Sequence, residues 1–353
     1  MCRQKAKTDK DAKVGRKLLW ADTKMQMENN WKVMREENGK QHNGQNMLKE
    51  PGQFPAQDIP NDDEQLTMRD LTVGYDRIPL IKNINLGVRP GEILTLIGPN
   101  GSGKSTILKT ITKQLKTIGG SVFLGKESMR ELTDSEISRH LSMVMTERIH
   151  TELLSGRDVV ATGRYPYTGR LGILSQQDWK KVDEAIALVH AGEVQQQDFR
   201  RISDGQRQRL MLARAICQDT QVLILDEPTS YLDMGFKLDI LTTIRMLARK
   251  KNLAVIMSLH ELDLAQKISD IIACVKGDRI DRVGTPEEIF SGNYVQQLYG
   301  VKPQQFEPQT GQVFMERPEG IPEVFVIGGG GTGLAVYNLS LIHISEPTRH
   351  AQI

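Results

Sequence analysis

The stretch "EILTLIGPNGSGKSTILKTITKQL", residues 92–115, decides the fold of this 353-residue chain. It begins with "EILTLIG", a short apolar run of the kind that forms a strand buried on both faces of a parallel sheet. A turn with three glycines follows, and "TILKTITKQL" then has the composition of a helix. A buried strand, a glycine-rich turn and a helix in this order predict an α/β protein whose sheet is flanked by helices.

The turn matches the pattern G-x-x-x-x-G-K-[ST], a motif whose backbone wraps around phosphate groups. Its glycines allow close approach of the chain, while successive N–H groups and the helix N-terminus supply partial positive charge. Lys104 adds a full charge for the β- and γ-phosphates, and the Ser105 hydroxyl can ligate Mg²⁺. A chance glycine-rich turn is the alternative, but the flanking strand and helix disfavour it. The predicted phosphate-binding residues are Gly98, Pro99, Asn100, Gly101, Ser102, Gly103, Lys104, Ser105 and Thr106.

A second apolar run, "VLILDEP", ends in two acids, Asp226 and Glu227. The carboxyl end of a strand in a parallel sheet lies at the ligand crevice, so we expect both acids beside the phosphate loop. Asp226 is placed to hold Mg²⁺, directly or through water, and Glu227 to orient and deprotonate an attacking water. A solvated strand end before Pro228 is the alternative. His260 ends another apolar run and could reach a γ-phosphate, although a lone histidine is more often structural.

Composition bounds the class of protein. Hydrophobic residues make up 39% and charged residues 25% of the chain, and the net charge of +2 does not indicate nucleic-acid or membrane-surface binding. Cys2, Cys217 and Cys274 lie far apart with no metal or redox spacing, which indicates reduced thiols in a cytosolic protein. No apolar run approaches the roughly 18 residues that cross a bilayer.

Strand and helix patterns begin near residue 64 and continue to about residue 301. "LTMRDLTVGY" and "PLIKNINLGV" alternate like half-buried strands, whereas residues 129–200 are mostly helical in pattern, which predicts a helical insertion in the α/β core. Residues 1–63 are polar, and we predict a disordered extension or upstream sequence translated from too early a start codon. A docked amphipathic helix around Lys17–Met34 is the alternative.

Six features in one order resemble the ATP-binding subunits of ABC transporters, over residues 64–301. Tyr75 stands where the family stacks an aromatic ring on adenine, the glycine-rich turn corresponds to the Walker A loop, and "VLILDE" to Walker B. "ISDGQ", residues 202–206, occupies the signature position, "SYLD", residues 230–233, the D-loop, and His260 the switch histidine. The resemblance makes His260 a functional candidate. It implies a P-loop NTPase core, a mixed sheet flanked by helices, with an antiparallel β subdomain and a helical insertion.

In this family two subunits sandwich two ATP molecules, with Walker A of one subunit facing the signature of the other. The resemblance therefore implies ATP and Mg²⁺ as cofactors, closure of a homodimer, and hydrolysis with Lys104, Glu227 and His260 as catalytic residues. The other partners that it implies are transmembrane permease subunits and an external substrate-binding protein, with no nucleic acid, at the cytoplasmic face of the plasma membrane. The residues implied to face the opposing subunit's ATP are Ser203, Asp204, Gly205 and Gln206, with Asp233 in the D-loop.

The signature position departs from the family pattern, which begins L-S-G-G-Q. Ile202 and Asp204 replace its first and third residues. Ser203 resembles an N-cap for a helix over about residues 204–216. An acid that faced ATP would be repelled, but in the first turn of this helix Asp204 can point sideways and interact favourably with the helix dipole.

A second departure lies where the core joins the helical insertion. The family has a glutamine there, near Mg²⁺ and the permease, and this chain has Thr146 or Glu147, which puts the coupling role of the loop in doubt. "GRYPYTGRLG" and "HELDLAQKISD" resemble ATPases that energise the import of iron-siderophores, haem or cobalamin. The alternatives are an ABC ATPase of another transporter type and a soluble ABC ATPase outside transport.

Three segments follow the resemblance. Residues 302–322 read as a linker. "EVFVIGGGGTGLAVYN", residues 323–338, contains a G-x-G-x-x-G and is predicted to be the truncated start of a second α/β domain, with a glycine-rich linker as the alternative. Residues 339–353 resemble the in-frame translation of a transposase sequencing adapter, so no function is assigned to them.

Overall fold

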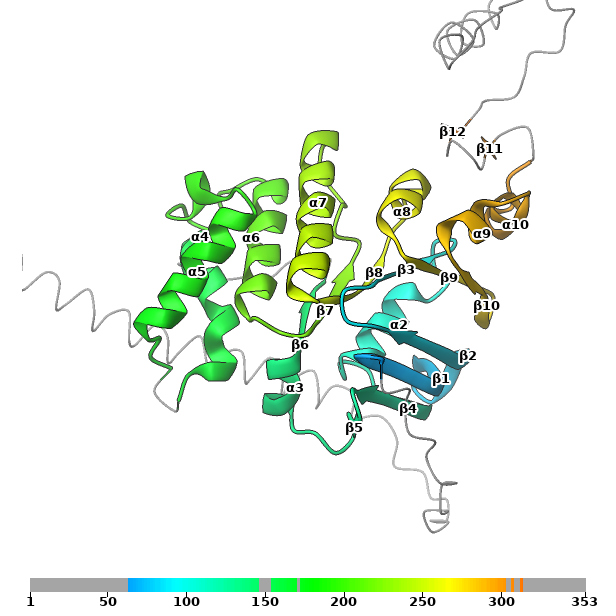
Figure 1. Cartoon of the computed structure of the whole chain (residues 1–353), viewed down its shortest axis with the longest axis horizontal. Coiled ribbons are helices and arrows are strands. Elements are labelled where there is room, and N and C mark those ends of the chain that lie inside the picture. Colours follow the sequence, from blue (N-terminus) through cyan, green and yellow to red (C-terminus); the bar gives the residue numbers. More distant parts are fainter. Residues whose placement is uncertain (1–62, 146–153, 170–171, 303–305, 308–311, 314–353) are drawn as a thin grey trace, which may run out of the picture. The chain divides into compact units, whose positions relative to one another are not determined.

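The computed structural model describes residues 63–145, 154–169, 172–302, 306–307 and 312–313 (Figure 1). The predictions for residues 1–62, for Thr146 and Glu147, and for segments 323–338 and 339–353 lie outside the described residues. Within the predicted linker, β11 (Phe306–Glu307) pairs antiparallel with β12 (Gln312–Val313).

The chain divides into two compact units. The helical unit lies within Thr151–Asp219, and the sheet unit comprises Asp62–His150 and the chain from Thr220 onward. This division starts and ends later than the helical insertion that we predict at residues 129–200. The unit starts later because Leu141–Val144 forms a strand of the main sheet, and a four-residue run is too short to show a period. It ends later because the helix Asp204–Cys217 packs on the other helices of the unit.

The main sheet has six strands in the order β10-β9-β3-β8-β7-β6. All neighbours are parallel except β10, which turns back on β9 as an antiparallel hairpin. Every residue of β3, β7 and β8 is buried, as continuous apolar runs predict. This arrangement confirms the predicted fold class. The strands are β3 (Ile93–Ile97), β6 (Leu141–Val144), β7 (Val222–Asp226), β8 (Ala254–Ser258), β9 (Ile271–Lys276) and β10 (Arg279–Gly284).

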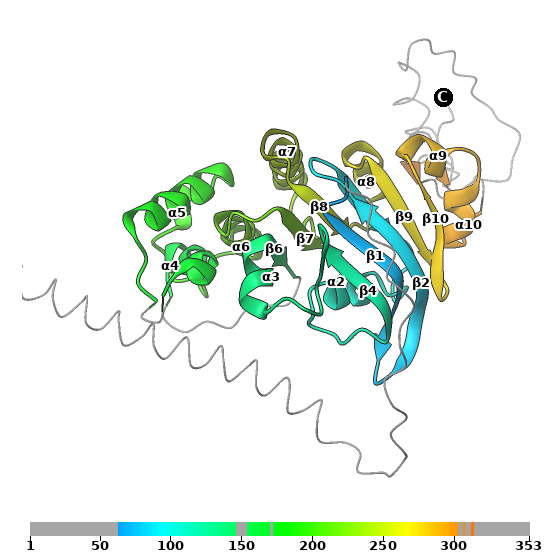
Figure 2. The same cartoon turned by 60° about the horizontal axis from the view of Figure 1, so that its bottom comes forward.

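A second, antiparallel sheet has the order β2-β1-β4-β5. Helix α2 (Lys104–Ile111) lies between the two sheets, where it contacts β1, β7 and β8 (Figure 2). Ile107, Leu108 and Ile111 of this helix are fully buried in the shared core. The buried helix therefore fixes the turn that precedes it at the carboxyl end of β3. The strands are β1 (Leu66–Tyr75), β2 (Ile78–Val88), β4 (Gly119–Leu124) and β5 (Glu127–Ser128).

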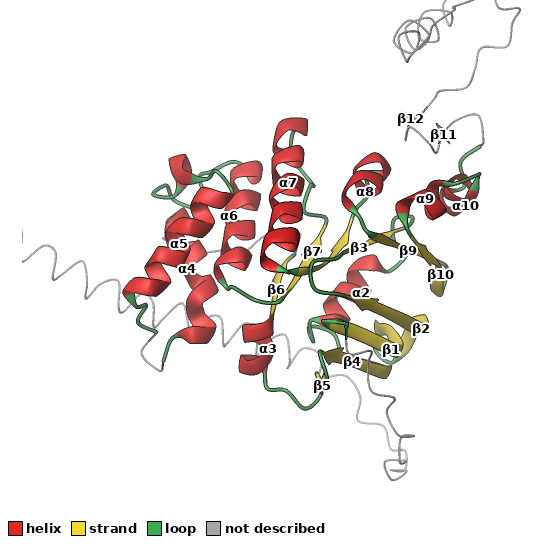
Figure 3. Cartoon of the chain, viewed as in Figure 1, coloured by secondary structure: helices red, strands yellow, loops and turns green. Residues whose placement is uncertain are grey.

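The remaining helices of the sheet unit complete its layers. Helices α7 and α8 cover the face of the main sheet opposite α2 (Figure 3). Asp233 caps α7 by accepting a hydrogen bond from the Phe236 amide. Among the described residues, none of the helices combines the length and the apolar character that a membrane span requires. The helices are α3 (Asp134–His140), α7 (Met234–Lys251), α8 (Leu262–Ile268), α9 (Pro286–Phe290) and α10 (Tyr294–Tyr299).

The helical unit is built around α6, against which α4 and α5 both pack. Ser155 and Ser175 cap α4 and α5 with capping boxes. In each, the serine side chain accepts from the backbone amide of the third helical residue, and the side chain of that residue accepts from the serine amide. Its elements are α4 (Gly156–Ala161), the 3₁₀ helix η1 (Thr162–Tyr167), α5 (Gln176–Leu188), the 3₁₀ helix η2 (Gly192–Val194) and α6 (Asp204–Cys217).

Candidate functional site

A pocket of about 650 Å³ lies in the sheet unit at the carboxyl ends of β3, β7 and β8. It brings together residues from five segments of the sequence: the end of β1, the start of β2, the glycine-rich turn with the first residues of α2, and the residues that follow β7 and β8. The predicted residues that line it are Tyr75, Asn100, Gly101, Gly103, Lys104, Ser105, Thr106, Glu227 and His260. Leu80 of β2 also lines the pocket and was not predicted.

The shape of the turn depends on its glycines. Gly98 and Gly103 have φ angles of 150° and 96°, which other residues rarely adopt. A Cβ atom on Gly98 would lie 2.4 Å from the carbonyl oxygen of Val275, and one on Gly103 would lie 2.6 Å from the Ile81 side chain. A side chain at Gly98 would therefore collide with backbone, and the φ angle of Gly103 disfavours any residue other than glycine, so the path of the turn requires both glycines.

Lys104 is only 5% exposed, and its ammonium group is directed at the turn itself. Nζ donates to the Gly98 carbonyl over 2.7 Å and to the Pro99 carbonyl over 3.0 Å. Burial lowers the pKa of Lys104, and the negative charges of Glu227 and Asp226 oppose this effect. In this structure the lysine thus satisfies its charge with backbone oxygens, for which phosphate oxygens are natural replacements.

Asp226 is 4% exposed and receives two hydroxyl groups. Oδ1 accepts from Ser105 Oγ at 3.1 Å and from Ser258 Oγ at 2.7 Å. The Ser105 hydroxyl and the Asp226 carboxylate are neighbouring hard oxygen ligands, a donor set that fits Mg²⁺, which takes few protein ligands and otherwise binds water and phosphate. Ser258 was not predicted, although it is the last residue of β8 and stands two residues before His260.

Glu227 is held at several points. Its φ of 49° is unusual for a residue with a side chain and costs on the order of 1–2 kcal/mol. Its amide donates to Ser258 Oγ over 3.0 Å. Its carboxylate contacts His260 Nε2 through Oε1 at 2.5 Å and accepts from Ser230 Oγ through Oε2 at 2.9 Å. Both carboxylate oxygens therefore have defined orientations toward the pocket residues.

Tyr75 stands at the rim of the pocket. Its side chain is 50% exposed, and its hydroxyl lies 3.3 Å from Thr106 Oγ1. The neighbouring rim residue, Leu80, is also exposed. An exposed aromatic ring beside an apolar side chain is suited to contact with a flat ring system.

The predicted signature residues lie in the helical unit, at the start of α6. Ser203 Oγ accepts from the Gln206 amide over 3.2 Å, and the Gln206 side chain accepts from the Ser203 amide over 2.9 Å. The Asp204 carboxylate pairs with Arg207 one turn along the helix. The charge of this acid is thereby offset at the helix surface, and Gly205 adds no side chain to the same turn.

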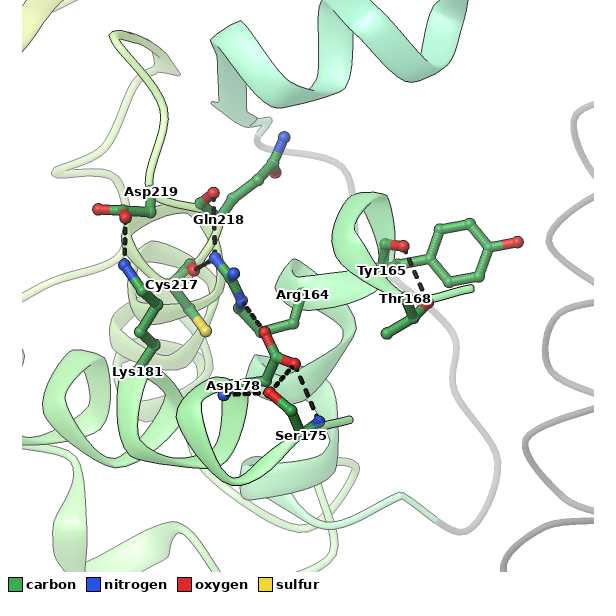
Figure 4. A network of polar contacts seen from close by, with 9 residues as sticks. All are labelled: Arg164, Tyr165, Thr168, Ser175, Asp178, Lys181, Cys217, Gln218 and Asp219. Carbon is green, nitrogen blue, oxygen red and sulfur yellow. Dashed lines mark hydrogen bonds and ion pairs between the residues drawn. The ribbon is translucent and has the colours of Figure 1, made fainter. Parts of the chain in front are cut away.

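The opposite end of α6 is anchored by Arg164, which is 6% exposed (Figure 4). Its Nε donates to Asp178 Oδ1 over 2.9 Å, and its Nη1 donates to the Cys217 carbonyl over 3.0 Å. That carbonyl belongs to the last turn of α6, where no helical amide can satisfy it. Burial disfavours the charged form of Asp178, yet hydrogen bonds from Ser175 and Arg164 together hold its pKa below the usual range.

Arg164→Ala is expected to lower the free energy of unfolding by about 3–5 kcal/mol, because it leaves the buried Asp178 charge without its partner. Urea unfolding followed by circular dichroism measures the loss. Arg157→Ala is the matched control, since Arg157 also pairs with an acid on α5, Asp183, but at an exposed site that contributes about 0.2–1 kcal/mol. Equal losses in the two variants would show that the Arg164 pair is not a stabilising anchor.

The comparisons with known proteins agree with one another. The sequence pattern of the family described as ABC transporter matches residues 81–230. An uncharacterized ABC transporter ATP-binding protein of Methanocaldococcus jannaschii is 40% identical over 272 residues, which are 77% of this chain and 94% of that protein. The achromobactin transport ATP-binding protein of Dickeya dadantii is 33% identical over 236 residues, which are 67% of this chain and 88% of that protein.

Solved structures resemble the fold. A dimeric ATP-binding cassette in a post-hydrolysis state with ADP and Pi has a TM-score of 0.56 at 24% identity, covering 63% of this chain and 98% of that one. An inward-facing transporter assigned to the metal-chelate type has a TM-score of 0.59 at 22% identity, covering 67% of this chain and 89% of that one. At these identities the likeness concerns the fold alone.

Proposed function

This chain belongs to the ATP-binding proteins of ABC transporters, an ATPase family, and on that premise we propose that it energises the import of an iron-siderophore, haem or cobalamin-type chelate. The observation that carries the solute class is the segment "GRYPYTGRLG" together with "HELDLAQKISD", which resembles importers of this kind. A relative named for transport of the siderophore achromobactin supports the same class. The pocket in the sheet unit is the proposed ATP site.

Different residues of the site would have different roles in ATP binding and hydrolysis. Lys104 would leave the carbonyls of Gly98 and Pro99 and bind the β- and γ-phosphates. Ser105 and Asp226 would hold Mg²⁺, which when bound neutralises charge on the phosphate oxygens. The ring of Tyr75 would stack on adenine at the rim.

Glu227 would act as the general base. Its carboxylate takes the proton of a water whose oxygen attacks the γ-phosphorus, while the bond from that phosphorus to the bridging oxygen breaks. His260 already contacts one oxygen of this carboxylate, and Ser230 donates to the other. His260 would turn from Glu227 to donate to the γ-phosphate, which leaves the first oxygen free for the water.

The start of α6 would serve the ATP of a second subunit in a homodimer. Its N-terminus carries partial positive charge suited to a γ-phosphate. The Ser203 hydroxyl accepts from the Gln206 amide and keeps its own proton for donation to a phosphate oxygen. Asp204 would not oppose this contact, because its charge is paired with Arg207. The Asp233 segment of each subunit would meet the other at the same interface.

The assignment to import is tested by purifying the chain with its permease. We expect co-purification from detergent-solubilised membranes, and ATPase activity that rises when the complex receives a binding protein loaded with a ferric siderophore, haem or cobalamin. The unloaded binding protein is the control. A chain found only in a soluble or ribosome-bound pool would contradict transport, whereas stimulation by a different class of solute would contradict only the chelate assignment.

A further inference from the structure

A side chain far away in the sequence contacts the first residue of the phosphate loop. The Gly98 amide donates to the hydroxyl oxygen of Tyr299 over 3.0 Å, although the two residues are 201 positions apart. Tyr299 is the last residue of α10, and Gly300 closes this helix with a φ of 67°. Helix α10, which does not line the pocket, thus contacts the first residue of the loop.

We propose that Tyr299 is a positioning residue for the phosphate loop. Its hydroxyl accepts from the Gly98 amide and thereby fixes the orientation of that peptide group. The inference rests on the proposed ATP-binding role of residues 98–106. It adds a residue outside the six motifs, supplied by a helix that contributes nothing to the lining of the pocket.

Gly98 is hydrogen-bonded through its carbonyl as well as through its amide. The Gly98 carbonyl accepts from Lys104 Nζ over 2.7 Å, so both backbone polar groups of this residue have a side-chain partner. When Lys104 turns to the phosphates, that hydrogen bond is lost and the bond from Tyr299 remains. The carbonyl of Val275 closes the space on a further side, since even a Cβ atom on Gly98 would come within 2.4 Å of it.

Tyr299 suits this role because its hydroxyl is neutral and its helix is firmly packed. Burial raises the pKa of Tyr299 to about 12, so its hydroxyl is neutral at physiological pH and accepts from an amide without adding charge near the phosphates. Its helix is anchored by the buried side chains of Val295 and Leu298. At the start of the same helix, the Tyr294 hydroxyl donates to Asp281 over 2.9 Å. The hydroxyl of Tyr299 therefore stands on a supported element.

Tyr299→Phe tests the proposal, because it removes only the hydroxyl group. We expect the KM for ATP to rise about five- to tenfold while kcat changes less than about twofold, as loss of one hydrogen bond to the loop predicts. Tyr294→Phe is the matched control. It removes one hydroxyl from the same helix, breaks the contact with Asp281 instead, and should leave KM unchanged.

Hydrogen exchange of the Gly98 amide gives a second readout in the nucleotide-free protein. Faster exchange in Tyr299→Phe, with parent-like exchange in Tyr294→Phe, would support the proposal. An unchanged KM in Tyr299→Phe, or an equal rise in both variants, would overturn it. Lys104→Ala separates this result from failure of the ATP site: if that variant binds ATP as the parent does, the assigned phosphate loop is wrong, whatever Tyr299 does.

Discussion

Replacing Glu227 with glutamine is expected to slow ATP hydrolysis about 10²- to 10⁴-fold, the range that a general base contributes. Glutamine has nearly the same shape and can still accept the hydrogen bond from Ser230, but it cannot take the proton of the attacking water. Because ATP still binds, the variant should accumulate as a closed, ATP-bound dimer. Phosphate release measures the rate, and light scattering with and without ATP measures the dimer.

The control for this prediction is a neighbouring acid. Glu261 follows His260 in sequence, pairs with Lys237 and accepts from Thr229, and does not line the pocket. Glu261→Gln should therefore hydrolyse ATP within about twofold of the parent rate, since it removes a charge without removing a base from the reacting atoms. Parent-like turnover in Glu227→Gln would show that the general-base assignment is wrong.

Ser203→Arg is expected to abolish detectable hydrolysis, a loss above about 10²-fold, which is what removal of one preorganised donor costs. The long side chain would fill the space that we propose for the γ-phosphate of ATP bound to the second subunit, and the serine donor would be gone. ATP binding to the isolated monomer should remain, because the pocket in the sheet unit contains no residue of α6. Nucleotide titration of the monomer and steady-state hydrolysis give the two measurements.

Loss of the helix cap could by itself explain the loss of hydrolysis in Ser203→Arg. A variant that loses the cap of another helix tests this explanation. Thr133 begins α3 with the same capping box as Ser203, and its site is exposed and has no proposed contact with ATP. Thr133→Arg should lose a comparable stability, about 0.5–2 kcal/mol, and keep hydrolysis. Wild-type turnover in Ser203→Arg would reduce the start of α6 to a surface helix.

The core of the fold was predictable from the sequence because its central strands are continuous apolar runs. β3 and β7 are buried on both faces, and each is followed directly by residues with a recognisable chemistry. The edge strand β6 was not predicted, because it is four residues long and stands between helical patterns. The start of the helical unit depends on that strand, and its end depends on α6, which packs on α4 and α5, so both limits lie later than the predicted residues 129 and 200.

The candidate site was predictable where its chemistry lies in short local patterns. The glycine-rich turn and Glu227, which directly follows β7, meet at one pocket, and Asp226 at the end of β7 accepts from Ser105 of the turn. Ser258 was missed because a single serine carries no pattern, and Ser230 was recognised only as part of the D-loop and not as a partner of Glu227. No sequence signal could reveal Tyr299, because the folded chain alone brings it to Gly98.

The position of Lys104 has a consequence for the life cycle of the site. The Lys104 ammonium donates to two acceptors within the loop, the carbonyls of Gly98 and Pro99, so the proposed binding of ATP would exchange one set of contacts for another. Such an exchange would yield less net affinity than new contacts, and it would favour departure of the spent nucleotide, because the two carbonyls can accept from the lysine again. If Lys104 binds ATP as proposed, its contacts with the loop would re-form after each turnover and would speed the release of the product.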